Sequence, residues 1–492
     1  MRDDSLWRRL KDAAGTVRDA LDTDVALQGA MAAAIELAAT RYAVDPGARW
    51  EPGSPLRLWF AGYAGTRNTG ADVRVEEMIR QVRHLLGDRH CALSISTLDA
   101  DRSRGYFPTV RQLLLPRIFP KFVADTVHGV HGVIACEGSM FKSKFASALS
   151  TFMVGALGCA AAENKLAVGY GGEAGAMDPS LEALVRRYCR DALILCRNEE
   201  SRSVLATLGV ASAAGTDTAW TFDPAAPAVG EAVLRRLGWD GAAPVLLVCP
   251  IHPFWWPVKP SVAKGVAMAV SGAYADAHYD SVYFHRSGAE VDAAYAAYLD
   301  GLAHGIRAFT ARHPCFVAYV GMEALDRSAC ADLAARRPAP ILVSDEHDHR
   351  TMVSVLRRAR ALLSSRYHAV VCSMGGLVPS AGVTMDERIR NLMADRGTPD
   401  LCLTVDDPAL GPKVEEALRR LWADGDALSD GIGRCVATNL RRMGGMGRTF
   451  VDHVRERHPA FPLRPGLGED GDPWAHLPPL PAAQEAIAAR WA

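Results

Sequence analysis

Residues 56–72 read LRLWFAGYAGTRNTGAD, in which a strand-like apolar run gives way to a glycine-rich segment. Leu56–Phe60 is a short apolar run of the kind found in buried β-strands, and a glycine-rich segment follows it. That segment leads into a helical pattern with apolar positions at Val75, Met78, Ile79 and Val82. Glycines between a strand and a helix let the backbone approach a ligand, and the helix N-terminus favours an anion. A tight turn without a ligand gives the same pattern, so both interpretations stay open.

Similar short apolar runs recur along the chain and alternate with longer amphipathic stretches. They lie at residues 56–60, 92–96, 133–135, 166–168 and 192–195, and again at 245–248, 282–284, 316–320, 341–343 and 361–363. This alternation predicts parallel sheets with crossover helices, and it lapses at Asp223–Pro227. We therefore predict an α/β protein with two Rossmann-like domains, over residues 54–228 and 240–425, and a ligand cleft between them.

Extensions are predicted at both ends. Residues 1–50 form a helical pattern, with apolar positions at Leu6, Leu10, Val17, Leu21 and Val25. Residues 426–492 are predicted to be helices and loops, with an exposed loop rich in Gly and Pro over residues 463–481. The uncharged stretch from Phe145 to Ala162 contains Ser, Thr and Gly, which favours a buried helix over a membrane span.

The composition excludes several classes of protein. With 49% apolar and 23% charged residues in a chain of 492, wholesale disorder and a single small module are excluded. A net charge of −1 provides no global field for nucleic acid. The 11 cysteines form no CxxC pair, and the first residues lack the apolar core of a secretory signal, so we expect reduced thiols and a cytoplasmic location.

A second candidate loop follows the run at residues 133–135. It includes Glu137, Gly138, Ser139, Lys142 and Lys144 and leads into the uncharged helix. Two lysines beside a Gly-Ser loop at a helix start could hold a phosphate. Both lysines could equally be solvated loop residues.

Arg197, Arg366 and His368 follow predicted strands, one arginine in each half. Because strand ends face the cleft and a guanidinium grips carboxylate or phosphate with two prongs, the two arginines could clamp a small anion. The alternatives are a surface ion pair of Arg197 with Glu199 or Glu200, and a hydrogen-bonded core histidine at His368.

Two further motifs have structural explanations. His347-Asp348-His349 looks like a metal tripeptide, but adjacent turn residues rarely converge on one ion, and Asp348 is better placed as a helix cap. We therefore predict no metal site. Trp255, next to Trp256, could stack on a sugar or base, although a loop anchored by apolar packing fits equally well.

Taken in order, several stretches resemble the polysaccharide pyruvyl transferase family. Gly62, Gly65, Asn68 and Gly70 match its opening loop in spacing, with Ala71 at an Asp position and Asp72 where Glu is usual. Glu137-Gly138-Ser139 occupies the place of a triple-glycine loop, and Gly169–Gly175 resembles a later glycine-rich turn. Further similar segments are Cys196–Ser201, Thr216–Trp220, Ser364–Ala369 and Gly382–Arg388, so the resemblance covers about residues 56–400.

The resemblance implies a fold like that of GT-B glycosyltransferases and transfer of a pyruvyl group from phosphoenolpyruvate to sugar hydroxyls. Its donor-binding residues correspond to Arg197, Arg366 and His368. As a hypothesis, Arg366 holds the carboxylate, Arg197 holds the phosphate, and His368 protonates the methylene carbon before two hydroxyls form a cyclic ketal. Phosphoenolpyruvate is then a donor substrate, and no other cofactor is implied. The acceptor would be a sugar or glycan, and a lipid-linked one would bring the protein to the inner face of the membrane.

Two other functions stay open. A GT-B-type glycosyltransferase that uses a nucleotide sugar would suit the Trp255 loop and the altered glycine-rich loops. A non-catalytic binding homologue would explain the departures at Ala71 and Glu137. The sequence leaves undecided the acceptor sugar, its lipid or nucleotide linkage, and the oligomeric state.

Overall fold

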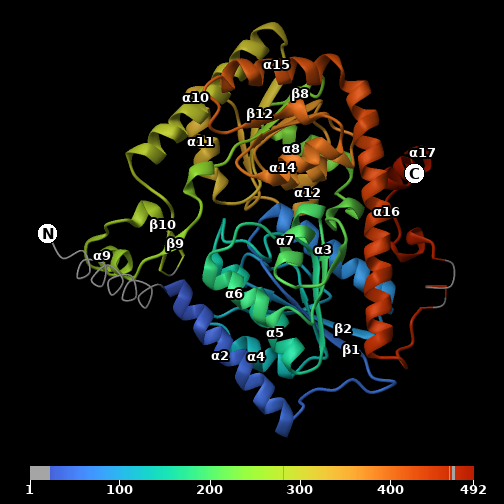
Figure 1. Ribbon diagram of the computed structural model, residues 1–492. Coiled ribbons are helices and arrows are strands. Elements are labelled where there is room, and N and C mark those ends of the chain that lie inside the picture. Colours follow the sequence, from blue (N-terminus) through green and yellow to red (C-terminus); the bar gives the residue numbers. More distant parts are fainter. Residues whose placement is uncertain (1–22, 281, 465, 468–470, 492) are drawn as a thin grey trace, which may run out of the picture.

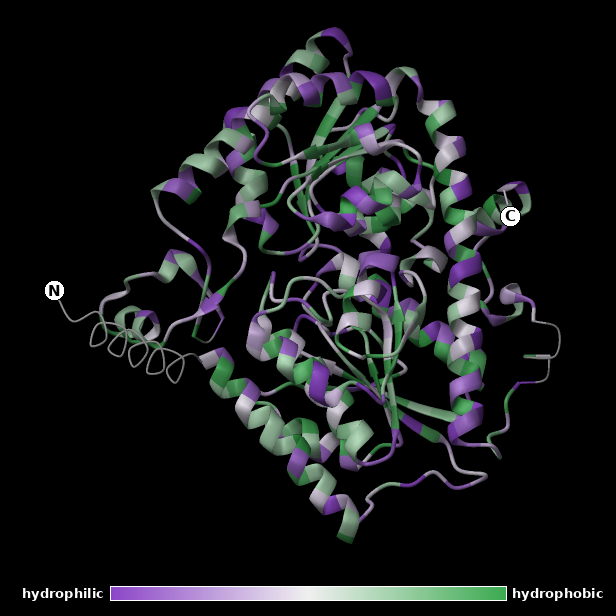
Figure 2. Ribbon diagram, viewed as in Figure 1, coloured by the Kyte–Doolittle hydropathy of each residue, from purple (hydrophilic) through white to green (hydrophobic). Residues whose placement is uncertain are grey.

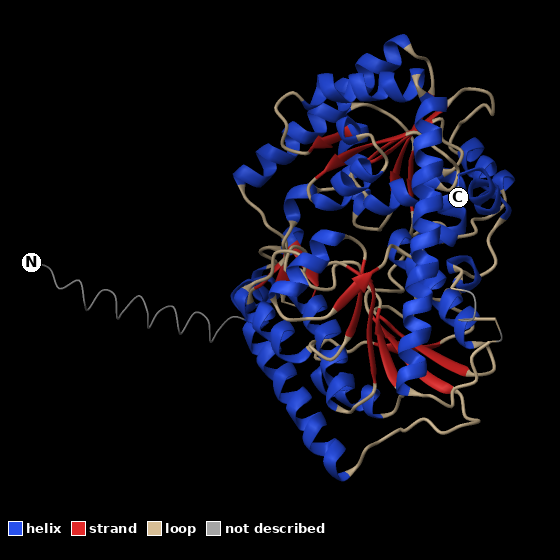
Figure 3. Ribbon diagram, turned by 45° about the vertical axis from the view of Figure 1, so that its right-hand side comes forward, coloured by secondary structure: helices blue, strands red, loops and turns tan. Residues whose placement is uncertain are grey.

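The computed structural model describes residues 23–491, with gaps at residue 281, residue 465 and residues 468–470. Two parallel β-sheets lie one above the other, each covered by helices (Figure 1, Figure 3). The apolar residues gather on the strands and on the inward helix faces (Figure 2). The predicted fold class, two Rossmann-like halves with helical extensions, is confirmed. The expected apolar positions at Leu6, Leu10, Val17 and Leu21 lie outside the described residues.

The first sheet has seven strands in the order β3-β2-β1-β4-β5-β6-β7. Its strands are β1 (Leu56–Ala61), β2 (Cys91–Thr97), β3 (Arg111–Leu114), β4 (Gly132–Ala135), β5 (Leu166–Gly172), β6 (Leu193–Cys196) and β7 (Ser212–Ala214). Its helices are α3 (Thr69–Leu86), α4 (Pro120–His128), α5 (Ser147–Ala162), α6 (Pro179–Tyr188) and α7 (Glu199–Thr207). The strand order reverses between β1 and β4, so a crevice opens at their carboxyl ends.

The second sheet repeats this plan with six strands in the order β13-β12-β8-β14-β15-β16. Its strands are β8 (Val245–Cys249), β12 (Phe316–Gly321), β13 (Ile341–Val343), β14 (Ala361–Ser364), β15 (Ser380–Thr384) and β16 (Cys402–Thr404). Its helices are α8 (Pro227–Arg236), α10 (Ala289–Arg312), α11 (Asp326–Arg336), α12 (His349–Leu356), α13 (Tyr367–Met374), α14 (Glu387–Asp395) and α15 (Leu410–Ala423). Here the order reverses between β8 and β14, which places the second crevice before α13.

The central strands are largely apolar because helices cover both faces of each sheet. Every residue of β4 and β5 is buried, and Trp59 and Phe60 of β1 are fully inaccessible to solvent. In the parallel register Phe60 lies beside Ile95 of β2 and Ile134 of β4. Continuous apolar runs of this kind are typical of buried parallel strands.

A small insertion separates β8 from α10. It contains β9 (Lys259–Pro260), α9 (Val262–Ser271), β10 (His278–Asp280) and β11 (Tyr283–Phe284). Residues 282–284 were expected to form a strand of the second parallel sheet, and this prediction is wrong. β11 instead pairs antiparallel with β9 and β10, in a three-stranded sheet of its own. A short apolar run predicts a strand but contains no information about its partner.

Helix α2 (Thr23–Val44) covers the uncharged helix α5. Gly155 and Gly158 of α5 face Met31 and Ile35 of α2, and a Cβ on either glycine would collide with those side chains. The predicted buried helix after Phe145 is therefore confirmed, and the N-terminal extension supplies its cover.

Helix α16 (Gly425–Arg457) runs along both halves of the molecule, ahead of the terminal helix α17 (Ala482–Trp491) (Figure 1). Asn439 of α16 accepts a 2.6 Å hydrogen bond from Thr216, in the loop after β7. The prediction of an exposed loop over residues 463–481 is wrong in part, because the short helix η5 (Pro473–His476) packs against α16 and buries His476 and Leu477. Apolar residues separated by Gly and Pro have no period that would have indicated this packing.

Candidate functional site

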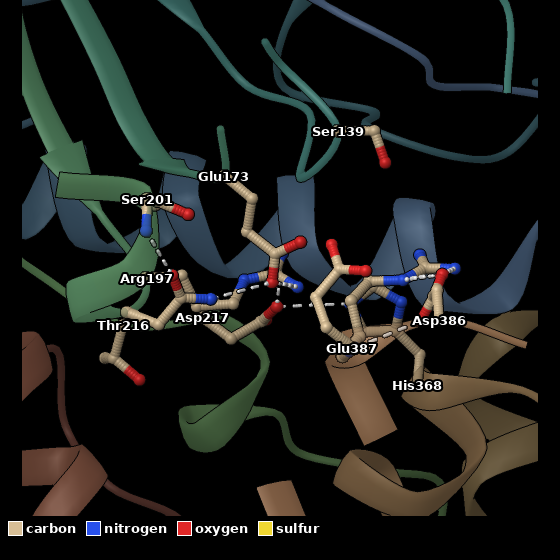
Figure 4. A network of polar contacts seen from close by, with 12 residues as sticks. Ser139, Glu173, Arg197, Ser201, Thr216, Asp217, His368, Asp386 and Glu387 are labelled. Atoms are coloured by element: carbon tan, nitrogen blue, oxygen red, sulfur yellow. Dashed lines mark hydrogen bonds and ion pairs between the residues drawn. The ribbon is translucent and has the colours of Figure 1, made fainter. Parts of the chain in front are cut away.

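Side chains from the two halves contact each other beyond the carboxyl ends of β6 and β14 (Figure 4). Arg197 comes directly after β6, and His368 lies in the first turn of α13. Both side chains contact Asp217, which follows β7. The structure thus brings together two of the sequence-predicted residues through a carboxylate that the sequence analysis did not single out.

Arg197 is a buried cation held by two carboxylates. Its Nη2 lies 2.8 Å from Oδ2 of Asp217 and its Nη1 lies 3.4 Å from Oε1 of Glu173, while its guanidinium lies over the ring of Tyr367. The side chain is 6% exposed. Burial lowers the pKa of Arg197, but Asp217 and Glu173 raise it by more, so the group stays charged.

Two donor atoms of this arginine have no hydrogen-bond partner. Within the described part of the chain, neither Nε nor Nη2 of Arg197 has an acceptor in suitable geometry, so the short contact with Asp217 is ionic but misaligned. Buried donors normally have an acceptor, so two buried donors without one require an explanation. A ligand with two oxygens in one plane would satisfy both.

The alternative of a surface ion pair between Arg197 and its neighbours is wrong. Glu199 pairs with Arg202 at 2.7 Å on the exposed side of α7. Arg197 itself is buried. Its backbone N–H extends the sheet by donating to the carbonyl of Gly172 in β5.

His368 and Asp217 form a buried pair. Nε2 of His368 lies 3.2 Å from Oδ2 of Asp217, whose carboxylate also contacts Nε of Arg74 at 3.4 Å. Burial raises the pKa of Asp217, yet Arg197 and His368 lower it well below its usual range. Burial lowers the pKa of His368 more than Asp217 raises it, so the free protein holds a neutral imidazole beside a carboxylate.

Arg74 of α3 ties the first half together beneath this pair. It is fully buried and donates to the carbonyls of Cys136, Tyr170 and Gly171 at 2.9, 3.1 and 2.6 Å. Glu137, a predicted binding residue, lies 3.8 Å from the same guanidinium. Arg74 therefore holds the carboxyl ends of β4 and β5 in place around Asp217.

Two predicted glycines allow this close packing. A Cβ at Gly70 would lie 2.4 Å from atoms of the His368 ring, and a Cβ at Gly138 would lie 2.5 Å from Nη2 of Arg197. Gly62 similarly approaches Cys136, because a Cβ there would lie 2.6 Å from its Sγ. The glycines of both loops thus make room for the functional side chains.

Gly70→Ala is expected to displace His368 and lower turnover by about a hundredfold, because a small misplacement of a reacting group has an effect of that order. Alanine suits a helix, but its Cβ would crowd the buried His368 ring, so the free energy of unfolding should fall by about 1–3 kcal/mol. The measurement is phosphate or nucleotide release by the variant. Gly445→Ala on α16 is the matched control, because nothing lies within 4 Å of its Cβ, and equal losses in both variants would contradict the prediction.

The predicted lysines connect the two halves. Nζ of Lys142 lies 2.6 Å from Glu173 and 2.5 Å from Glu387 of α14, and Lys144 donates to the carbonyl of Met385 at 2.7 Å. Lys142 is buried, so the alternative of a solvated loop residue is wrong for it. Because each amino group already has a partner in the second half, both lysines fix how the halves meet.

Arg366 belongs to a second cluster. It forms a bidentate contact with Asp326 and lies 3.1 Å from Glu323, which also accepts a 2.6 Å hydrogen bond from Tyr63. Asn68 donates to the same Glu323 at 3.1 Å. The expected clamp of Arg197 and Arg366 on one anion is not formed here, because the two guanidinium groups face different carboxylates.

The remaining predicted residues hold loops in shape. Asn68 caps α3 by accepting from the backbone of Ala71, and Asp72 accepts from the backbone of Gly65 at 2.9 Å. Gly65 has a positive φ of 74°, which a residue with a side chain rarely adopts. Burial raises the pKa of Asp72 to about 7. These three residues therefore shape the first loop around the site.

Ser139 and Trp255 lie away from the Arg197 cluster. Figure 4 shows the Ser139 side chain apart from the linked group of Arg197, Asp217 and His368. The Trp255 ring is stacked between His252 and His285, with centroid distances of 4.4 Å to each. Of its two interpretations, the structure favours the packed loop anchor.

The predicted helix cap at Asp348 is confirmed. Its carboxylate accepts a 2.7 Å hydrogen bond from the backbone of Thr351 at the start of α12. His349 reaches across to Glu76 of the first half. Within the described residues, no three His, Cys, Asp or Glu side chains are grouped so as to hold a metal ion.

Asp217, Arg74 and Glu173 are site residues that the sequence analysis missed. Asp217 lies in the segment Thr216–Trp220, which carried part of the family resemblance. Arg74 was detectable as a charge among the apolar positions of α3, between Val73 and Val75. Glu173 gave no signal beyond its place in a glycine-rich turn.

No protein-family model and no curated protein matches this sequence. The fold is similar to UDP-GlcNAc 2-epimerase from Methanocaldococcus jannaschii, with 9% identity and a TM-score of 0.47, over 75% of this chain and 93% of that one. It is also similar to a UDP-glucose:anthocyanidin 3-O-glucosyltransferase in complex with UDP, with 9% identity and a TM-score of 0.47, over 82% and 99%. UDP-GlcNAc 2-epimerase from Neisseria meningitidis bound to UDP-GlcNAc matches at 8% identity and a TM-score of 0.44, over 79% and 99%.

Across the part of the chain that the structure describes, no helix has both the length and the apolar character to cross a membrane.

Proposed function

We propose that this protein is a transferase that moves the pyruvyl group of phosphoenolpyruvate onto hydroxyls of a sugar. The observation that carries the proposal is the buried Arg197, whose Nε and Nη2 have no hydrogen-bond partner among the described residues and lie beside the His368–Asp217 pair. The family resemblance assigns the same arginine and histidine to the donor. The halves of the molecule meet at this point, as expected for a two-substrate site.

The charges around Arg197 suit a compact anion. A carboxylate or phosphate can replace part of the misaligned contact with Asp217 and take two hydrogen bonds from the guanidinium. Arg74 then remains to balance Asp217, at 3.4 Å. Arg197 therefore faces one anionic group of the donor, while Arg74 continues to balance Asp217.

The transfer can be written with the atoms in balance. His368, once protonated, donates a proton to the methylene carbon, which becomes a methyl group and leaves an oxocarbenium-like carbon. One sugar hydroxyl adds to that carbon, the bond to the phosphate oxygen breaks, and a second hydroxyl on the sugar closes the ketal. The two hydroxyl protons restore His368 and protonate the departing phosphate. Arg197 stabilises the negative charge of the phosphate as it leaves.

A second candidate is glycosyl transfer from a nucleotide sugar, and the protonation state of His368 favours it. A neutral imidazole bonded to a carboxylate is suited to take a proton from an acceptor hydroxyl. The hydroxyl oxygen would attack the anomeric carbon, and the nucleoside diphosphate would leave with its charge facing Arg197. In this case His368 acts as a base, whereas pyruvyl transfer requires it first as an acid.

A thermal-shift titration separates these functions. Phosphoenolpyruvate is expected to stabilise the wild type and to leave Arg197→Ala unchanged, while a panel of nucleotide sugars has no effect on either. The matched control is Arg202→Ala, whose side chain pairs only with Glu199 among the described residues. Stabilisation by a nucleotide sugar alone would establish the second candidate. Phosphoenolpyruvate binding without turnover on any acceptor would indicate a non-catalytic homologue.

The affinity for phosphoenolpyruvate is expected to increase as the pH falls. Burial lowers the pKa of His368 in the free protein, and a bound anion favours the imidazolium and raises that pKa. Between the two values the complex binds more protons than the free protein, so acid favours binding. Above the pKa of the complex the contribution of His368 vanishes. Calorimetry in buffers of different ionisation enthalpy measures the proton uptake.

His368→Gln is the control for this pH dependence. Phosphate groups titrate near pH 6 and change their own protonation on binding, and the variant retains that contribution alone. The same proton uptake in the variant and the wild type would exclude His368 as its source.

A further inference from the structure

A cavity of about 570 Å³ lies in the insertion between β8 and α10, away from Arg197. Figure 1 shows this insertion, with α9, β9 and β10, at one side of the molecule. The residues that concern the argument are Lys259, Lys264, His285, Arg286, Gly288 and Glu290. None of the site residues described above lines it.

The cavity has an excess of positive charge. Lys264 and Arg286 form no ion pair with a carboxylate among the described residues, and the amino group of Lys264 lies 5.2 Å from the ring centroid of Tyr274. Lys259 contacts Asp178 at 3.2 Å, on the first half. Glu290 is the acidic side chain at its edge. Two cations thus remain without a balancing charge.

The N-terminus of α10 faces the same cavity. The helix has 24 residues, and Gly288, its N-cap, supplies no side-chain hydrogen bond. The first backbone N–H groups of α10 therefore have no side-chain cap, and the helix dipole adds positive potential at this end. Gly288, Ala289 and Val291 all line the cavity.

A buried polar atom points independently to a ligand. His285 is 4% exposed, lines the cavity, and its Nδ1 has no hydrogen-bond partner in the described part of the chain. Its ring is held by stacking on Trp255 at 4.4 Å. A buried ring nitrogen is normally paired, so a ligand in the cavity that reaches this atom would complete its hydrogen bonding.

We propose that this cavity binds a phosphate or diphosphate group. Lys264 and Arg286 supply the charge, the uncapped backbone of α10 binds oxygens, and His285 pairs with one more oxygen or its hydroxyl. The site is separate from the Arg197 site, and the proposal does not depend on the identity of the donor. The group can belong to a free phosphorylated molecule or to a lipid headgroup.

The two kinds of ligand would differ in their contact with the outer face of α9. Val262, Val266 and Val270 are spaced four residues apart and are 54%, 58% and 82% exposed, so they form one apolar stripe beside the cavity. A lipid that carries a diphosphate would place its chain against this stripe. A free phosphorylated molecule would leave it unused.

Calorimetric titration with inorganic pyrophosphate tests the site on the full chain. Arg286→Ala is expected to weaken binding at least about tenfold, as loss of a charge-assisted contact does, and Lys264→Ala should act in the same direction. Arg104→Ala is the matched control, because this arginine is exposed, pairs with Asp101 and lies outside the cavity. Lys264 packs on Tyr274, so Arg286→Ala carries the test if Lys264→Ala folds poorly.

Arg197→Ala separates this proposal from the proposed function. It is expected to retain pyrophosphate binding while it loses phosphoenolpyruvate binding. Pyrophosphate binding that is lost in Arg197→Ala and unchanged in Arg286→Ala would overturn the proposal, and so would the absence of any pyrophosphate binding.

The source is tested with phosphatidylcholine vesicles that contain farnesyl diphosphate, against phosphatidylcholine alone. Binding to the first vesicles only, reduced by Arg286→Ala and by Val266→Asp, would support the site and assign it to a lipid. Pyrophosphate binding without vesicle binding would support the site and assign it to a free molecule.

Discussion

Arg197→Ala is expected to abolish donor binding and to lower turnover by about a thousandfold, the order seen when one charge-stabilising donor is removed. The variant loses the cation that faces the departing group and both of the unpaired donor atoms. It also leaves Asp217 and Glu173 with less compensation, in a place closed to water. Phosphate or nucleotide release and donor affinity are the measurements.

The same substitution is expected to destabilise the fold, because breaking a buried ion pair costs about 3–5 kcal/mol. Urea unfolding separates this loss from the loss of function, and assays must be made where the variant is folded. Arg197→Lys retains the charge without the planar fork, so it should recover stability more than donor affinity. Donor affinity in a folded Arg197→Ala that equals the wild-type value would contradict the role given to this residue.

Arg74→Met is expected to lower the free energy of unfolding by about 3–5 kcal/mol. Methionine has a similar length but leaves three buried carbonyls, at the ends of β4 and β5, without their donor. It also leaves Asp217 without one of its cations. The measurement is the urea unfolding free energy of the variant against the wild type.

Arg83→Met, on the same helix, is the matched control for Arg74. Arg83 is 27% exposed and contacts Asp88 at 3.5 Å, so its removal should cost no more than about 1 kcal/mol. A loss in Arg74→Met no greater than that in Arg83→Met would show that Arg74 does not hold the strand ends together.

The two parallel sheets were predictable because their signal is local. A strand covered on both faces is a continuous apolar run, and the crossover helix after it has its own period, so residues 56–60 and 245–248 indicated strands without any partner. The insertion was not predictable in the same way. Residues 282–284 gave the signal of a strand, but pairing with Lys259–Pro260 depends on a contact that no local pattern contains.

Only those site residues that follow a predicted strand could be predicted from the sequence. Arg197 and His368 follow strands, and a parallel sheet brings such positions to one edge. The directions in which these side chains point could not be predicted from the sequence. Arg366 precedes α13 with an extended backbone and His368 lies in its first turn, so one side chain faces Asp326 and the other Asp217. Asp217 depends on contacts with both halves, which no spacing reveals.

The path of α16 affects how a chain of this kind can change during evolution. The helix begins after the second half and returns to the first, where Asn439 bonds Thr216, the neighbour of Asp217. Exchange of the second half with that of another protein would therefore also replace part of the first. A chimera that exchanges the second half would therefore have to keep the contact of α16 with the first half.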